Sequence, residues 1–318
     1  MSKGKKCDIM SEQLTSYDDI CRLIRSKREE EIITVLGPTA TGKTRLAVRI
    51  ARDFGAEIIS ADSRQVYRGM DIGTGKDLDD YVVDGQTIPY HLIDIAEPGV
   101  EYNVAQYQQA AYVAMDEIRA RGHEIVLCGG SGMYIESLLG GFRLAPVTRD
   151  PQLYAELSAK TDEELTEILK SFRALHNHTD TCERPRLIKA VEIEYYYQQH
   201  PEWKDATRKV PSVIIGLRGD RDLIRAKITR RLKERLENGM IEEVERLINN
   251  GANVNQLLRY GLEYKFVTMF LLGKISKEEM FEKLNTAIHQ FSKRQMTWFR
   301  KMERSGFDIH WIDIASLS

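Results

Sequence analysis

Residues 32–44 read IITVLGPTATGKT, and this stretch decides the fold. Its first part, Ile32–Leu36, is short, apolar and rich in β-branched side chains, which is typical of a buried strand. Residues 37–44 match the pattern G-x-x-x-x-G-K-[ST], and helical composition follows over Lys43–Phe54. A strand, a glycine-rich loop and a helix in this order predict a P-loop, whose backbone N–H groups surround a phosphate at the helix N-terminus.

This motif predicts a phosphate cradle in which each residue type has a task. Lys43 supplies positive charge to the terminal phosphate oxygens, and the hydroxyl of Thr44 is a ligand for Mg²⁺. The glycines let the backbone wrap closely around the anion. The expected phosphate-binding residues are Gly37, Pro38, Thr39, Ala40, Thr41, Gly42, Lys43 and Thr44.

The phosphate need not belong to ATP. NTP hydrolases with a P-loop also use a hydrophobic strand that ends in an Asp, which helps to hold the metal. The best candidate, IVLCGG at 125–130, ends without a carboxylate. The strand expected over 57–61 does end in one, Asp62. Because the carboxyl ends of neighbouring strands border the ligand crevice, we expect Asp62 to act on an acceptor beside the phosphates. The alternative is an ordinary turn aspartate.

The rest of the chain alternates strand and helix patterns, which predicts an α/β fold with a mostly parallel sheet covered by helices on both faces. Further strands are expected at 91–95, 125–128 and 213–217, and a helix at 103–121. Between them, charged sequence without strand patterns predicts helices at 155–173 and 184–199. We therefore expect an N-terminal extension (1–30, with a possible helix at 17–30), a P-loop core (31–140), an inserted all-helical domain (141–204), and a second part of the core with basic C-terminal helices (205–318).

Composition excludes several classes of protein. The chain has 318 residues, 42% hydrophobic and 30% charged, with no apolar run of the ~20 residues that span a membrane. Its start, MSKGKKCDIMSEQ, lacks the apolar stretch of a secretory signal. We expect a cytoplasmic monomer with no membrane partner. Its four scattered cysteines form no C-x-x-C pair and are expected to be reduced thiols.

Charge is unevenly distributed along the chain. Residues 218–304 contain 19 Lys and Arg against 12 Asp and Glu, whereas the remainder contains 27 against 36. A basic C-terminal third is one feature of proteins that bind nucleic acids. The alternative is a solvated helix surface with i,i+4 ion pairs, and charge alone does not exclude it.

With these motifs in view, the chain resembles the tRNA dimethylallyltransferase (tRNA isopentenyltransferase) family over nearly everything after residue 31. The resemblance rests on several segments in a fixed order, which a P-loop alone would not provide. They are GPTATGKT at 37–44, DSRQVYRGMDIGTGK at 62–76, HLIDIAEP at 91–98, GGSGMY at 129–134, RLIKAVEI at 186–193, DRDLIRAKITRRL at 220–232 and KRQMTWFR at 293–300.

The resemblance implies a Mg²⁺-dependent transfer of a dimethylallyl group from dimethylallyl diphosphate to N6 of the adenosine next to the anticodon, position 37 of the tRNA. The P-loop would then hold the diphosphate. Asp62 would be the general base that takes the proton from N6 as this nitrogen attacks the prenyl C1. Lys43 and a cation such as Arg221 would stabilise the charge that develops on the leaving diphosphate.

The same resemblance implies contacts with the tRNA anticodon loop. They fall on three segments: Asp62, Ser63, Arg64 and Gln65; Ser131; and Pro185, Arg186, Leu187, Ile188 and Lys189. We expect Trp298 and Phe299 to pack in the core rather than stack on bases. The chain departs from the family pattern at Asp77, Tyr90, Ser131, Pro185 and Glu263.

Three other functions compete with tRNA prenylation. A small-molecule kinase would use the same P-loop and Asp62 but would bind ATP and would not need basic C-terminal helices. An adenylate-type isopentenyltransferase would keep the chemistry and use free adenine nucleotides as acceptors. A non-catalytic RNA-binding protein would not need the intact Lys43, Thr44 and Asp62.

Overall fold

The computed structural model describes residues 14–100, 102–145, 147, 150–175, 181, 183–203 and 207–317. Most of the segment before α1 (Tyr17–Arg25) lies outside this set, as do Cys7 and Cys182. The other two cysteines, Cys21 and Cys128, are free and buried. None of the described helices is long and apolar enough to cross a membrane.

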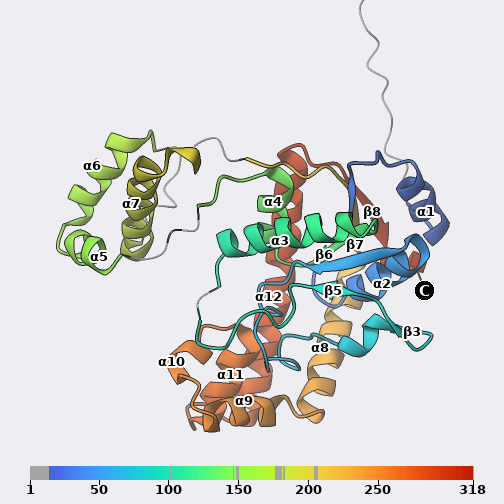
Figure 1. The fold of residues 1–318 in the computed structure, drawn as a ribbon. Coiled ribbons are helices and arrows are strands. Elements are labelled where there is room, and N and C mark those ends of the chain that lie inside the picture. The colour runs from blue at the N-terminus through green and yellow to red at the C-terminus, as the bar shows by residue number, and fades with distance from the viewer. Residues whose placement is uncertain are drawn as a thin grey trace, which may run out of the picture.

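A parallel sheet forms the centre of the described structure (Figure 1). Its six strands follow the order β5-β2-β6-β1-β7-β8, and every neighbouring pair is parallel. This confirms the predicted α/β class. The strands are β1 (Ile32–Leu36), β2 (Ala56–Ser60), β5 (Tyr90–His91), β6 (Glu124–Gly129), β7 (Ser212–Arg218) and β8 (Ile309–Asp313).

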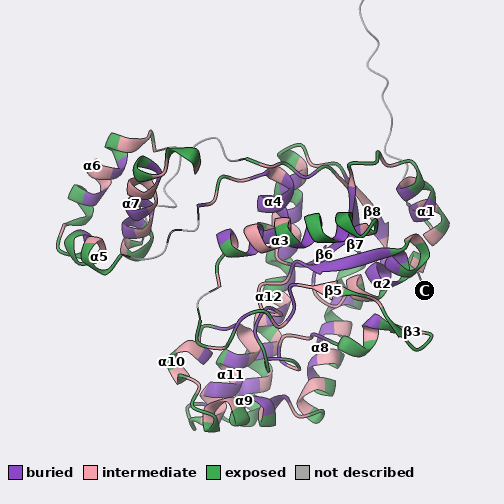
Figure 2. Cartoon of the chain, in the orientation of Figure 1, coloured by how far each residue is buried: buried purple, intermediate pink, exposed green. Residues whose placement is uncertain are grey.

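Helices cover both faces of the sheet because alternate strand residues point to opposite sides. Ile33 and Val35 of β1 pack in one hydrophobic cluster with α1 and α2 (Lys43–Phe54). Ile32 and Leu36 pack in a second cluster with α3 (Val104–Ala120) and α4 (Gly132–Gly140). All five residues of β1 are buried, as expected of a strand covered on both sides. Figure 2 shows this buried centre.

Most of the C-terminal helices lie beyond the carboxyl ends of the strands, below the sheet in Figure 1, and the last and longest of them runs from there upward past the sheet. They are α8 (Arg221–Glu237), α9 (Met240–Asn249), α10 (Val254–Leu257), α11 (Leu262–Leu271) and α12 (Lys277–Arg304). The 28-residue α12 joins the two clusters, since its Leu284 packs in the first and its Phe299 in the second. Ser276 and Glu279 form the capping box that starts this helix.

A helical module stands apart from the sheet and has its own small core (Figure 1). It consists of α5 (Pro151–Ser158), α6 (Asp162–Phe172) and α7 (Arg184–Gln199). The helical segment expected over 155–173 divides into α5 and α6. The chain breaks there because Thr161 caps α6, accepting from the N–H of Glu164 while the Glu164 side chain accepts from the Thr161 N–H.

Other differences from the expected elements lie in the loops and near the chain ends. The strand expected over 91–95 is only Tyr90–His91, because Leu92 and Asp94 have positive φ angles of 63° and 56° that end the extended backbone. The helix expected at 17–30 ends at Arg25 and buries Ile20 and Ile24 in the core. β8, α4 and a small hairpin of β3 (Val82–Val83) and β4 (Gln86–Thr87) were not expected.

Candidate active site

A pocket of about 610 Å³ opens where β1, β2 and β6 reach their carboxyl ends. Its size is typical of a site that encloses a small substrate. The P-loop, the turn after β2, the start of α4, and helices α8, α11 and α12 all contribute to its wall. The lining includes Thr39, Lys43, Thr44, Asp62, Ser63, Arg64, Gln65, Ser131, Arg231, Arg235, Glu263, Gln295 and Trp298. The structure thus brings the predicted Asp62–Gln65 turn and Ser131 to the P-loop.

The P-loop backbone has the shape that its glycines allow. At Gly37, φ is 155°, and a Cβ would lie 2.7 Å from the carbonyl oxygen of Leu217 in β7. Gly42 has φ of 82° and caps α2. The Thr41 hydroxyl donates to the carbonyl oxygen of Pro38 at 2.8 Å, which closes the loop on itself. These contacts hold the cradle open for an anion at the N-terminus of α2.

Lys43 is the cation closest to the cradle backbone. Its Nζ donates to the carbonyl oxygen of Pro38 at 2.7 Å. Burial lowers the pKa of Lys43 to about 8, and the positive charge of Arg231 acts in the same direction. The neighbouring Thr44 lines the pocket with its hydroxyl-bearing side chain, as the motif predicts.

Asp62 follows β2 and faces the same pocket. One carboxylate oxygen accepts from the N–H of Arg64 at 2.9 Å, which fixes the turn and leaves the second oxygen for a substrate. The next residue, Ser63, donates its N–H to the hydroxyl oxygen of Ser131 at 3.0 Å. Ser131 also donates its N–H to the carbonyl oxygen of Ala61 at 3.1 Å. The GGSGMY segment is therefore hydrogen-bonded to both residues that flank Asp62 in the chain.

The structure places the expected cation, Arg221, outside the pocket lining. Arg221 is exposed at the first turn of α8 and is not part of the pocket lining, whereas Arg231 and Arg235 of the same helix are. Arg231 donates to the hydroxyl of Thr39 in the cradle. Burial lowers the pKa of Arg231 to about 10, and the charge of Arg235 adds to this effect. The sequence held a signal for this placement. Intervals of four and three residues put Arg231 and Arg235 on the same helix face as the apolar Ile224 and Ile228, and such a face points into the protein.

Arg235 closes one side of the pocket. Its guanidinium lies 3.4 Å from Asp77 and packs against Gly75, where any side chain would collide with it. Glu263 at the start of α11 lines the pocket near both arginines, and burial raises the pKa of its carboxyl group. Asp77 and Glu263 are two of the departures from the family pattern. They add negative charge beside the phosphate-binding cations.

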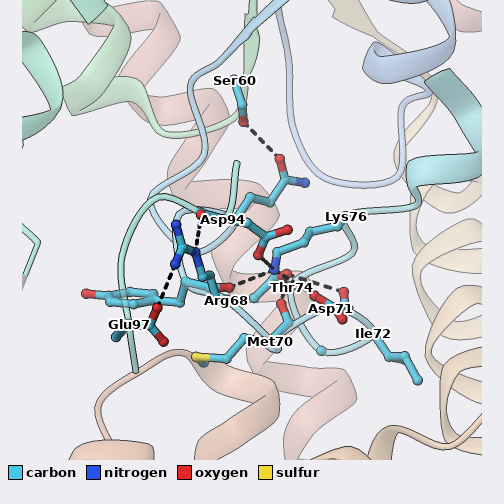
Figure 3. Close-up of polar contacts among 12 residues, drawn as sticks. Ser60, Arg68, Met70, Asp71, Ile72, Thr74, Lys76, Asp94 and Glu97 are labelled. Atoms are coloured by element: carbon cyan, nitrogen blue, oxygen red, sulfur yellow. Dashed lines mark hydrogen bonds and ion pairs between the residues drawn. The ribbon is translucent and has the colours of Figure 1, made fainter. Parts of the chain in front are cut away.

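A buried lysine organises the segment after Asp62 (Figure 3). Lys76 Nζ donates to the carbonyl oxygen of Tyr67 at 2.7 Å and to the carboxylate of Asp71 at 2.6 Å, and it also pairs with Asp94. Gln65 bridges the same segment: its Oε1 accepts from the Ser60 hydroxyl and its Nε2 donates to the Gly75 carbonyl oxygen, each at 2.9 Å. These contacts shape the loop that forms the pocket rim.

Glu243 of α9 is a second organiser, which the sequence analysis missed. Its carboxylate accepts from the N–H groups of Asp71, Ile72 and Gly73 at 3.0, 2.7 and 3.1 Å. Tyr264 donates its hydroxyl to the same group at 2.6 Å. Glu243 is 2% exposed, so its carboxylate holds the backbone of residues 71–73 in place and is not open to a ligand. Its spacing in α9 resembles that of any surface glutamate, so no sequence signal set it apart.

The expected tRNA-contact residues 185–189 lie in the helical module and not in the pocket lining. Leu187 and Ile188 are 1% and 3% exposed and belong to the module's core, so their side chains have no surface for RNA. Pro185 and Arg186 are exposed. Lys189 donates to the carbonyl oxygen of Val147 at 2.9 Å and is partly exposed.

The two aromatic residues near the end of α12 have different surroundings. Phe299 is fully buried, as expected. Trp298 is only partly buried: it packs against Gly132 and forms part of the pocket wall. Its ring and those of Tyr81 and Tyr134 add apolar surface to the pocket. Apolar rings and a polar cradle in one pocket suit an amphiphilic substrate.

Within the described residues, no group of three or more His, Cys, Asp or Glu side chains could hold a metal ion by itself. Mg²⁺ fits this site in another way, since it is commonly bound by one or two protein oxygens together with substrate phosphates. Thr44 lines the pocket and supplies such a hard oxygen donor.

Comparisons with known proteins agree with this geometry. The tRNA dimethylallyltransferase 2 of Bacteroides fragilis is 54% identical over 285 residues, covering 90% of this chain and 93% of the relative. The tRNA dimethylallyltransferase 1 of Porphyromonas gingivalis is 55% identical over 282 residues, covering 89% and 93%.

Solved structures show the same architecture. The tRNA isopentenylpyrophosphate transferase of Bacillus halodurans has a TM-score of 0.64 at 31% identity and covers 90% of both chains. A eukaryotic dimethylallyltransferase acting on tRNA shares the fold, with a TM-score of 0.74 at 23% identity and coverage of 89% and 74%. The family model described as IPP transferase matches residues 65–302. On this match and these identities, the chain belongs to the IPP transferase family.

Proposed function

We propose that this chain transfers a dimethylallyl group from dimethylallyl diphosphate to N6 of the adenosine next to the anticodon of tRNA, acting as a monomer. The observation that carries the proposal is the joint pocket of the P-loop and Asp62, in which β6 ends in Gly129 without a metal-holding carboxylate. Relatives over 50% identical across about nine tenths of the chain are named tRNA dimethylallyltransferases, which supports dimethylallyl transfer to tRNA.

The donor half of the reaction is supported by the cations of the pocket. The diphosphate would bind the N–H groups of the cradle, with Lys43, Arg231 and Arg235 around its oxygens. These groups are placed before the reaction and would stabilise the negative charge that grows as the C–O bond to the prenyl C1 breaks. Mg²⁺, held by Thr44 and phosphate oxygens, would add positive charge at the leaving group.

The acceptor half is supported by Asp62. The lone pair of an exocyclic adenine amine is delocalised into the ring, so N6 is a weak nucleophile and needs a base. As N6 bonds to C1, the electron pair of the C–O bond leaves with diphosphate and the N6 proton passes to Asp62. The aromatic side of the pocket would keep water from the electron-poor prenyl carbon.

The acceptor base has to leave its stack in the anticodon loop to reach this pocket, as in other enzymes that modify bases. Two surfaces are available for the rest of the tRNA: the helical module with Pro185, Arg186 and Lys189, and the basic C-terminal helices. Arg64 and Ser131 lie at the pocket itself and would contact the flipped nucleotide or its neighbours.

One labelling experiment separates the competing functions. The protein is incubated with radiolabelled dimethylallyl diphosphate and Mg²⁺, together with either bulk tRNA or AMP, ADP and ATP. We expect the label in tRNA alone, at an adenosine next to the anticodon. Label in the free nucleotides would instead identify an adenylate-type isopentenyltransferase. Asp62→Asn in parallel shows whether any labelling depends on this site.

A melting experiment tests the kinase alternative. Ligands that bind the folded protein raise its melting temperature, and at equal concentration the ligand that binds more tightly raises it further. We expect dimethylallyl diphosphate to raise the melting temperature and ATP at the same concentration to have a smaller effect. Stabilisation by ATP without stabilisation by dimethylallyl diphosphate would contradict the proposed donor and favour the kinase.

A further inference from the structure

One side chain of α12 joins the two halves of the pocket. Gln295 is 7% exposed, and its Oε1 accepts from the N–H of Thr39 in the cradle at 2.8 Å. Its Nε2 donates to the carbonyl oxygen of Gly130, after β6, at 2.9 Å. A side chain at Gly130 would collide with this amide, so the close approach requires glycine. The helix thus contacts the donor cradle and the GGSGMY segment through a single group.

The hydrogen bonds continue from Gly130 to the proposed base. Ser131 is the next residue, and its hydroxyl oxygen accepts from the N–H of Ser63 at 3.0 Å. Its own N–H donates to the carbonyl oxygen of Ala61 at 3.1 Å. Asp62 lies between Ala61 and Ser63. A short series of contacts therefore runs from the Thr39 N–H at the edge of the cradle, through Gln295, to the turn that carries Asp62.

The chemistry of an amide makes this connection sensitive to position. Gln295 offers one acceptor and one donor in a fixed plane, and each already has a complementary partner. A flip would set an N–H against the Thr39 N–H and a carbonyl against the Gly130 carbonyl. Leaving such buried groups unpaired is unfavourable, so the amide keeps this orientation. A shift of the cradle therefore moves Gln295 and the GGSGMY segment together.

We propose that Gln295 is a positioning residue that couples occupancy of the donor cradle to the placement of Asp62 and the acceptor site. This rests on the proposed function. Because α12 also presents exposed Lys293 and Arg300, tRNA bound to its outer surface would act on the same helix. The coupling is reciprocal: diphosphate binding tightens tRNA binding, and tRNA tightens diphosphate binding by the same factor.

The experiment measures that factor in wild type and in Gln295→Met. Methionine has a similar length but neither donates to Gly130 nor accepts well from Thr39. Dissociation constants for inorganic diphosphate with Mg²⁺ are measured with and without tRNA, and those for tRNA with and without diphosphate. The coupling ratio is the dissociation constant of one ligand without the other divided by the constant with it. We expect this ratio to be about 5 or more in wild type, the lower end of typical coupling, and near one in the variant.

Matched variants separate coupling from general damage. Gln290→Met makes the same change at an exposed position of the same helix and should keep the wild-type ratio. Ser131→Ala cuts the series at its other end and should also bring the ratio toward one, which keeps a test available if Gln295→Met does not fold. A merely structural Gln295 would lower the melting temperature and both affinities while leaving their ratio unchanged.

Two different failures are distinguishable. If wild type binds neither ligand, or labels no tRNA, the proposed function itself is wrong. If wild type prenylates tRNA but the ratio is one, or the ratio survives in both Gln295→Met and Ser131→Ala, the function stands and the coupling role of Gln295 is overturned.

Discussion

Lys43 Nζ donates a hydrogen bond to the carbonyl oxygen of Pro38 at 2.7 Å, across the loop to which both residues belong. The lysine is therefore already positioned over the cradle and does not have to be ordered by the substrate. Burial lowers the pKa of this ammonium to about 8, because leaving bulk water disfavours its charged form. The charge that should attract diphosphate is thus titratable close to neutral pH.

We first predict that the affinity for dimethylallyl diphosphate falls as the pH rises through about 8. The diphosphate favours the protonated ammonium and raises its pKa in the complex, so binding takes up a proton above that pH and weakens. Isothermal titration calorimetry from about pH 7 to about pH 9.5, in buffers of different ionisation enthalpy, measures both the affinity and the proton uptake. Lys43→Arg keeps its charge over this range and should bind with a pH-independent affinity. A wild-type affinity that is equally flat would contradict the prediction.

The second prediction concerns the two arginines of α8. Arg231→Gln removes a cation from the pocket and should lower the rate of transfer by about 10²–10³-fold, the usual effect of removing one donor to a developing oxyanion. Arg221→Gln is the matched control, since this side chain is exposed at the start of the helix, and its rate should stay within a few-fold of wild type. Single-turnover rates with preformed enzyme–tRNA complex decide between them. If the single-turnover rate falls strongly in Arg221→Gln and little in Arg231→Gln, then Arg221 is the cation that stabilises the leaving diphosphate, as the sequence predicts.

Third, Asp62→Asn should fold and bind both substrates but transfer the prenyl group roughly 10²–10⁴-fold more slowly, because an amide cannot accept the N6 proton. Asp77→Asn is a useful comparison. Asp77 lines the same pocket but pairs with Arg235, so its amide variant should change donor affinity more than the single-turnover rate. Turnover of Asp62→Asn close to wild type, with both substrates saturating, would remove Asp62 from the mechanism.

These variants also show what the sequence can and cannot predict. The P-loop, its strand and α2 follow from a contiguous motif, and their observed bounds match the prediction. Arg231 was missed because its role depends on which face of α8 meets the cradle, which only tertiary packing decides. Glu243 and Gln295 were missed for the same reason: each acts on backbone groups more than 160 residues away. A motif identifies residues that meet the ligand, but not those that hold the motif in place.

A fourth prediction concerns stability far from the pocket. Glu57 is almost fully buried and accepts two hydrogen bonds from Arg121, at 2.9 and 2.8 Å. It also pairs with His91 at 2.6 Å and His123 at 2.7 Å. Arg121 is the main cause that lowers the pKa of Glu57 from 4.5 to about 2. A depressed carboxyl pKa gives stability that is fully present above the unfolded value and is lost as the pH falls toward the folded one.

Glu57→Gln should therefore lower the free energy of unfolding at pH 7, and the deficit relative to wild type should shrink as the pH falls from about 4.5 toward about 2. Urea unfolding at a series of pH values measures it. Glu124→Gln is the control, because its pair with Lys27 at 2.9 Å is partly exposed and contributes little. A deficit that stays constant across the acid range would show that packing, and not charge, accounts for the effect of Glu57.

The last prediction concerns the basic surface of α12. Lys301 donates to both carboxylate oxygens of the buried Glu136 at 3.2 Å, so its charge is compensated within the protein. Lys293 and Arg300 are exposed and have no ion-pair partner in the described part of the chain. Seven residues apart, they share one face of the helix. If each holds a tRNA phosphate, replacing both by Gln should flatten the log–log dependence of tRNA affinity on salt by about 1.4, since one single-stranded contact contributes about 0.7.

Catalysis at saturating tRNA should change little in this double variant, because neither side chain is part of the pocket lining. Replacing Lys274, just before α12, and Lys277, its first residue, by Gln removes the same charge and controls for net charge alone, since Lys277 lies about four turns from Lys293. Long-range attraction would lower affinity equally in both double variants, whereas direct contacts flatten the salt dependence only when Lys293 and Arg300 are removed. Equal slopes in the two variants would mean that this face of α12 is solvated surface and that the tRNA backbone lies elsewhere.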